Sequence, residues 1–190
     1  MLHWMAHPSL PPAVRFCPPS NSGPDRAWPD GPRRWHGHTG ASQVLRRDVG
    51  DAAVIVEDSG LFDLASFDQS LGTLSGDGNV RVGSDTITIG TGNLESSFDG
   101  SISGGGGLKK IGSGSLTLSG ANTYQGPTMI MSGTIDVVGS NERLSDTTAV
   151  SVQSGAKFQL LENTIESIGS LSGSGRVTIS SYRQFSACFR

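Results

Sequence analysis

Acidic and basic residues that could build a catalytic or metal site are few and scattered in this sequence. Asp77 and Arg81 form the best-spaced acid and base, and a polysaccharide lyase would need such a pair beside clustered aspartates. Asp77, Asp85 and Asp99 carry the oxygen ligands that Ca²⁺ prefers. Calcium-binding nonapeptide repeats need GGxGxD in tandem, and no such register is present. We therefore expect solvated turn carboxylates, and we assign no catalytic, cofactor-binding or metal-ligating residue.

Three other motifs resemble functional sites but lack the groups that would complete them. Glu57-Asp-Ser-Gly60 offers a serine, yet residues 51–180 contain no histidine to act as its base. Gly90-Thr-Gly92 and Gly112-Ser-Gly114 are incomplete as dinucleotide fingerprints, and no βαβ pattern surrounds them. His36-Gly-His38 lies in a proline-rich stretch, where we interpret it as an incidental pair rather than a metal site.

Charge is distributed unevenly along the chain. Residues 1–50 hold six Arg against three Asp, whereas residues 51–180 hold six Lys or Arg against fourteen Asp or Glu. The acidic body argues against nucleic-acid binding, because phosphate recognition needs clustered Lys and Arg. Lys109-Lys110 is the basic pair of this body, and we expect it at a solvated strand edge. Cys17 and Cys188 both lie outside the body, which therefore has no disulfide or Cys–metal framework.

The composition predicts three segments. Residues 1–50 contain eight of the nine Pro and all three Trp, which predicts a disordered Pro/Arg-rich arm that is not native to the domain. Residues 51–180 form the body, and residues 181–190 read as a divergent or truncated tail without the body's glycines. No apolar run is long enough for a transmembrane helix, and the N-terminus lacks the apolar region of a signal peptide.

The body alternates between short apolar triplets and turns rich in Gly, Ser, Asp and Asn. Each triplet places apolar residues at its first and third positions, which is the period of a half-buried strand. The triplets are Val54–Val56, Phe62–Leu64, Val80–Val82, Ile87–Ile89, Leu116–Leu118, Ile135–Val137, Val150–Val152, Phe158–Leu160 and Val177–Ile179. No window shows the apolar stripe of an amphipathic helix.

An internal repeat connects the two halves of the body. Residues 70–80 match residues 167–177 at seven of eleven positions with an offset of 97, and the match continues upstream at an offset of 96. A long repeat of short strands predicts a solenoid in which each coil buries its apolar face against the next. At roughly 20–27 residues per coil the body would hold about five coils. An antiparallel sandwich is the competitor, but Asp77-Gly78 and Asp99-Gly100 are the only strong hairpin dipeptides in the body.

Residues 112–137 carry the pattern GSGSLTLSGANTYQGPTMIMSGTIDV. This pattern resembles the passenger-associated β-strand repeat of bacterial autotransporters, and the resemblance extends over residues 54–180. The physical interpretation agrees: Leu116 and Leu118 should point inward and Thr117 outward. Asn122 should turn its amide onto local backbone or stack on a neighbouring coil. Pro127 stands where the family often has Gly. Because proline has no backbone N–H to donate, it must lie in a turn or at a strand start.

The resemblance implies an all-β, right-handed parallel β-helix that is exported and threaded through a C-terminal outer-membrane barrel. The leading hypothesis is a structural or interaction module of an autotransporter passenger, in the extracellular space or at the cell surface, with adhesion as a candidate activity. A lyase-like carbohydrate-active enzyme on the same fold and a non-functional gene fragment are the alternatives. The expected partner is a surface or glycan ligand, without nucleic acid. Uncapped solenoid ends also predict end-to-end self-association.

Overall fold

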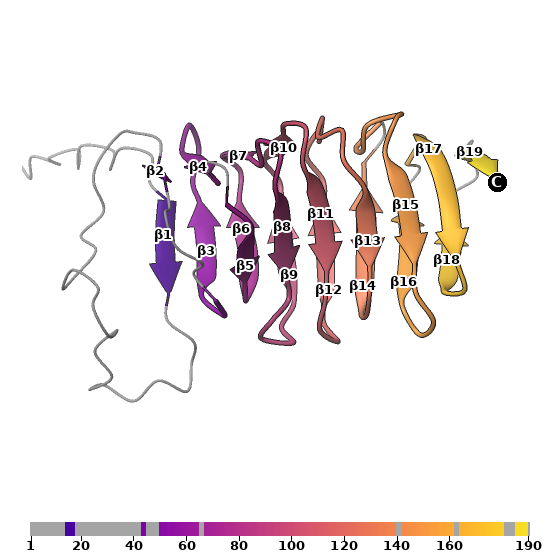
Figure 1. Cartoon of the computed structure of the whole chain (residues 1–190), viewed down its shortest axis with the longest axis horizontal. Coiled ribbons are helices and arrows are strands. Elements are labelled where there is room, and N and C mark those ends of the chain that lie inside the picture. Colours follow the sequence, from indigo (N-terminus) through magenta and orange to yellow (C-terminus); the bar gives the residue numbers. More distant parts are fainter. Residues whose placement is uncertain are drawn as a thin grey trace, which may run out of the picture.

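The computed structural model describes residues 14–17, 43–44, 50–64, 67–139, 142–161, 164–180 and 185–189. These residues form β-strands and turns without any helix, and the strands wind into a parallel β-solenoid (Figure 1). None of the described segments could therefore cross a membrane as an apolar helix. The predicted all-β solenoid is confirmed, whereas the predicted arm at residues 1–50 and the tail at 181–190 lie mostly outside the described residues.

Three sheets run along the solenoid axis. Sheet A contains β1 (Val14–Cys17), β3 (Ala53–Val56), β6 (Thr73–Gly76), β9 (Ser96–Phe98), β12 (Ser115–Leu118), β14 (Thr134–Val138), β16 (Lys157–Leu161) and β18 (Arg176–Ile179). Sheet B contains β2 (Gln43–Val44), β4 (Leu61–Asp63), β7 (Asn79–Arg81) and β10 (Ser101–Ser103). Sheet C contains β5 (Gln69–Leu71), β8 (Thr86–Ile89), β11 (Gly107–Lys110), β13 (Thr128–Ile130), β15 (Ala149–Val152), β17 (Glu166–Gly173) and β19 (Phe185–Phe189).

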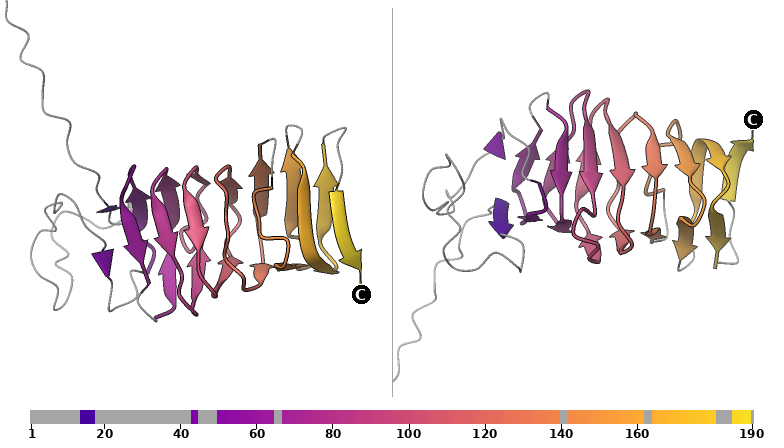
Figure 2. Two further views of the ribbon diagram at one scale, coloured as in Figure 1. Left: turned by 90° about the horizontal axis from the view of Figure 1, so that it is seen from above. Right: turned by 60° about the horizontal axis from the view of Figure 1, so that its bottom comes forward.

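Several coils are shorter than the sequence suggested. Paired strands of successive coils are offset by 18 residues at Leu71 and Ile89 and by 23 residues at Val137 and Leu160. Short coils raise the number of coils in the described part to about six instead of the expected five. The views in Figure 2 show the coils stacked in one line along the axis.

The interior is a set of aligned apolar rows. Leu116, Ile135 and Phe158 are register partners in sheet A and are fully buried. Leu118, Val137 and Leu160 form the second such row, while Thr117 lies between the two rows on the outward face. The strands of one row stand about 4.8 Å apart, so each side chain contacts its counterparts above and below. The predicted orientation of the repeat's leucines is confirmed.

The two sequence copies occupy different faces of the solenoid. Val56 and Gly76 pair in sheet A, whereas their counterparts Val152 and Gly173 pair in sheet C. The local geometry is nevertheless the same, because Gly76 has φ +101° and Gly173 has φ +106°. A Cβ at either glycine would lie 2.0 Å from the carbonyl oxygen of the paired valine. The repeat therefore encodes a strand-turn-strand unit, and its length does not equal a whole number of coils.

Candidate functional site

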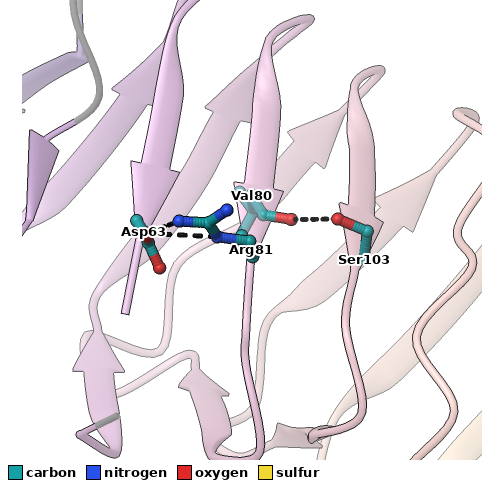
Figure 3. A network of polar contacts seen from close by, with 4 residues as sticks. All are labelled: Asp63, Val80, Arg81 and Ser103. Carbon is teal, nitrogen blue, oxygen red and sulfur yellow. Dashed lines mark hydrogen bonds and ion pairs between the residues drawn. The ribbon is translucent and has the colours of Figure 1, made fainter. Parts of the chain in front are cut away.

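An ion pair joins two coils on the outer face of sheet B. Arg81 on β7 donates from Nε to Asp63 Oδ2 on β4 at 3.1 Å, and its Nη2 contacts the same oxygen (Figure 3). The Asp63 side chain is 9% exposed and that of Arg81 is 57% exposed. The hydrogen bond and charge of Asp63 raise the pKa of the Arg81 guanidinium above its ordinary value. On the next strand, Ser103 donates to the carbonyl oxygen of Val80 at 3.3 Å (Figure 3).

The structure pairs Arg81 with Asp63 instead of with Asp77, the acid that the sequence suggested as its partner. Arg81 is committed to Asp63, while Asp77 is exposed in the turn between β6 and β7. In the second sequence copy, Ser174 and Thr178 stand at the positions that correspond to Asp77 and Arg81. They lie on other faces of the solenoid, so the two pairs are not equivalent surface positions. The structure does not build an acid–base site from Asp77 and Arg81.

The other candidate residues lie in separate turns. Asp99 is exposed and accepts a hydrogen bond from Ser119, and Asp85 is partly buried beside the glycines of residues 104–107. Within the described ranges, no cluster of three or more His, Cys, Asp or Glu could hold a metal. The Glu57–Gly60 motif is a tight turn closed by the Gly60 amide and the Glu57 carbonyl at 2.7 Å. His36 and His38 lie outside the described residues.

Lys110 is buried, so the expectation from the sequence is wrong for this residue. The basic pair was predicted at a solvated edge, yet Lys110 is 1% exposed and occupies an inward row of sheet C between Ile89 and Ile130. Its Nζ donates to the carbonyl oxygens of Ile111 at 2.5 Å and Gly112 at 3.1 Å. Burial lowers the pKa of this ammonium. The apolar stem of Lys110 packs in the inward row, and its ammonium group binds the carbonyl oxygens of the turn. The alternation of apolar and polar residues in the sequence does not reveal that a lysine can occupy such an inward position.

A shallow groove of about 540 Å³ runs along the turns that lead from sheet C to sheet A. Its lining crosses several coils and consists of Asn93, Gly112, Ser113, Ser132, Gly133, Thr134, Ser154, Gly155 and Lys157. Side chains connect the coils here, since Ser113 N donates to Asn93 Oδ1 at 3.0 Å and Ser132 Oγ to Gly112 O at 3.2 Å. The groove offers hydroxyl and amide groups and the Lys157 ammonium for hydrogen bonding.

Beyond β10, at the end of sheet B, polar side chains provide the hydrogen bonds between successive coils. We call this series of contacts the polar ladder. The edge amide of Ile102 on β10 donates to Asn122 Oδ1 at 2.9 Å, and Asn122 Nδ2 donates to Gly120 O and Arg143 O, both at 2.9 Å. In the next coil, the amides of Arg143 and Leu144 donate to the carboxylate of Glu166 at 2.9 and 2.8 Å. The predicted role of the Asn122 amide is confirmed.

Glu166 is the functional group in this ladder that sequence reasoning missed. Its side chain is fully buried. Burial raises its pKa to about 7 despite the two backbone hydrogen bonds, and the charges of Glu142 and Asp146 add to the shift. Glu142 in turn accepts from Ser167 N at 2.6 Å and Ser167 Oγ at 3.1 Å. The sequence signal that could have identified Glu166 is a glutamate at an inward position of a strand.

Buried hydroxyl groups stabilise the turn that precedes β13. Tyr124 is fully buried, and its hydroxyl lies 2.6 Å from Thr128 Oγ1. Thr148 of the following coil donates to Gly126 O at 2.7 Å. Burial raises the pKa of Tyr124, so it remains neutral. Pro127 directly precedes β13, which agrees with its predicted place at a strand start. Its carbonyl oxygen accepts from Leu108 N at 2.9 Å.

Comparison with known proteins agrees with this geometry. The family model described as "Passenger-associated-transport-repeat" matches residues 108–137, which hold Lys110, Asn122 and Tyr124. The chain is also similar to the "Adhesin BmaC autotransporter" of Brucella suis biovar 1 (strain 1330), at 40% identity over 82 residues. That alignment covers 40% of this chain and 2% of the relative's length, and no solved structure matches significantly. Residues 108–137 therefore match the passenger-associated transport repeat, and the chain is similar to a segment of an autotransporter adhesin.

Proposed function

We propose that this solenoid is part of an exported passenger, is displayed at the bacterial surface and contributes to adhesion through its outward side chains. The observation that carries the proposal is the passenger repeat at residues 108–137 together with similarity to a protein named as an autotransporter adhesin. The chain spans only a small part of that relative, so export, display and adhesion belong to the proposal.

The outer face of sheet A is the surface that we assign to binding. Register places Thr117, Asp136, Gln159 and Thr178 in one outward row across four coils. Parallel strands present such side chains on a flat, regular surface. Hydroxyl, amide and carboxylate groups in this arrangement suit the hydroxyls of a glycan, which is the ligand class that we propose.

A non-enzymatic role is favoured over a lyase. A lyase needs a basic residue free to act beside acidic or metal-bound groups, whereas Arg81 is engaged by Asp63 within hydrogen-bonding distance. Arg81, the basic member of the best pair in the sequence, makes its ion pair with Asp63. These contacts support a scaffold that binds through its surface.

A binding and depolymerisation experiment distinguishes the two activities. The fluorescently labelled chain is applied to an array of glycans, and the same glycans are incubated with unlabelled chain and analysed for shortened or unsaturated products. We expect retention on a subset of glycans that weakens when Gln159 is replaced by Ala, with no product formed. Asn79→Ala, on the separate outer face of sheet B, is the matched control. Product release would instead favour the enzyme, and absence of retention would contradict an adhesive role for this segment.

Display is tested in the bacterium that produces the protein. Antibodies against the chain should label intact cells, and external protease should remove the label. A periplasmic marker protein should resist the protease in the same cells. Labelling that appears only after the cells are broken would contradict surface display without bearing on glycan binding by the purified chain.

A further inference from the structure

The groove along the turns from sheet C to sheet A crosses the coils one after another. Its lining comes from four successive turns, those between β8 and β9, β11 and β12, β13 and β14, and β15 and β16. These turns lie side by side along the solenoid axis (Figure 1). Each turn contributes at least one polar side chain to the lining, in chain order Asn93, Ser113, Ser132 and Ser154. Hydrogen-bonding side chains therefore recur along the groove at the coil spacing of about 4.8 Å.

Backbone groups of the groove are already hydrogen-bonded between coils. The amide of Thr134 donates to Gly114 O at 3.3 Å, and that of Lys157 donates to Gly133 O at 2.9 Å. A peptide strand would find these groups occupied, so a ligand must bind here through side chains. The exposed hydroxyl of Ser113, which has no partner among the described residues, is one such group. Hydroxyl-rich ligands suit this surface better than an extended peptide does.

Apolar side chains adjoin the polar lining. Leu94 is 56% exposed and follows Asn93 directly in the chain, while Met131 is 42% exposed and directly precedes Ser132. They are two of the four large apolar side chains that are exposed among the described residues. A pyranose ring has an apolar face of C–H groups and an edge of hydroxyl groups. The margin and the lining of the groove offer partners for both.

Charges around the groove are balanced. Lys157 lines it, and the Lys110 ammonium donates to the lining residue Gly112 at its carbonyl oxygen. Two acids oppose these cations: burial and the charge of Glu95 raise the pKa of Asp136, and Lys157 partly offsets the rise. The acidic body as a whole repels anions at longer range. This balance favours an uncharged ligand over a polyanion.

We propose that this groove binds an extended, uncharged polysaccharide that lies along the solenoid axis with about one sugar per coil. A pyranose unit is similar in length to the coil spacing of about 4.8 Å. The groove volume of about 540 Å³ lies within the range of about 300–1,000 Å³ that is typical of small-molecule sites. The inference rests on the proposed glycan binding and extends it. Thr134 and Lys157 begin the strands that carry Asp136 and Gln159, so the groove borders the outward row of sheet A.

Titration calorimetry of the full chain tests the proposal with β-1,4-linked oligomers of glucose and of N-acetylglucosamine, from the monosaccharide to about six units. For at least one of the two series, affinity should rise with length by at least about tenfold and level off near about four units, because four turns line the groove. Ser113→Arg fills the groove at an exposed position and should weaken tetramer binding by at least about tenfold without changing the melting temperature. Ser84→Arg is the matched control, since Ser84 is exposed in the turn between β7 and β8.

Oligomers of β-1,4-linked glucuronic acid test the preference for an uncharged chain and should bind at least about tenfold more weakly than the uncharged series. Affinity that does not depend on length, equal or tighter binding of the acidic oligomers, equal loss with Ser84→Arg, or no binding of either uncharged series would each overturn the proposal. Retention on the glycan array that depends on Gln159 but not on Ser113 would overturn the groove and leave the adhesive surface standing. Absence of retention on every glycan would overturn both.

Discussion

Glu166 shows how a single buried carboxylate can replace the backbone of a missing strand. Its two oxygens accept the amides of Arg143 and Leu144. Burial, Glu142 and Asp146 oppose its ionisation, and its pKa rises from 4.5 to about 7. A raised pKa means that the protonated acid favours folding. This stabilisation is complete below about pH 4.5 and is lost as the pH rises through about 7.

Stability should consequently fall with rising pH because of this residue. We expect the melting temperature, measured by circular dichroism, to decrease between about pH 5 and about pH 8. Glu166→Gln cannot ionise and should lose most of that decrease. Glu57→Gln, in the turn between β3 and β4, should retain it. An unchanged pH dependence in Glu166→Gln would refute the assignment.

Asn122 carries a second residue-level prediction. Asn122→Ala removes the acceptor of the Ile102 amide and the donor to two carbonyls. An unsatisfied buried amide costs about 1–3 kcal/mol, and we expect a loss of that size in the free energy of unfolding in urea. Asn79→Ala, an exposed position whose side chain accepts from Ser101, should change stability by less than about 0.5 kcal/mol. Similar losses in both variants would show that the ladder has no special role.

Turns between strands depend on how closely successive coils approach. A Cβ on Gly106 would lie 1.8 Å from the carbonyl oxygen of Asp85, whereas one on Gly105 would meet Gly83 O at 3.4 Å. Gly106→Ala must therefore displace backbone of the preceding coil. We expect it to destabilise the protein by about 3 kcal/mol or more. Gly105→Ala in the same turn should stay within about 0.5 kcal/mol of wild type, and equal effects on chemical denaturation would contradict this account.

Strand prediction from sequence succeeded where both inward residues were apolar. It failed to mark β5 and β9 because Gln69 and Ser96 are inward and buried. Ser96 is tolerated inside because its hydroxyl accepts the Leu74 amide at 3.1 Å. A partner one coil away decides whether a polar residue can be inward, and the local pattern contains no information about that partner.

At the scale of the whole molecule, the parallel strand pairs of the described residues join neighbouring coils. Solenoid stability is then approximately a sum of coil and interface terms. Leu116→Ala in a fully buried central row should destabilise by roughly 2–5 kcal/mol. In hydrogen exchange it should increase exchange in β9, β12 and β14 more than in β3 and β4. Val177→Ala should confine its effect to the C-terminal coils, and a uniform increase with Leu116→Ala would indicate one cooperative unit instead.

The sequence by itself determined the strand period, the glycine turns and the passenger-like motif, because each depends on residues in neighbouring strands and the turns between them. It determined the solenoid class because such units recur at an offset of 97 residues. Only the tertiary structure decided that Arg81 meets Asp63, that Lys110 is buried and that Glu166 receives two amides. These contacts join residues one coil apart. Which residues meet depends on the length of each coil, and that length varies between 18 and 23 residues. For the same reason the two sequence copies fold alike but face different directions.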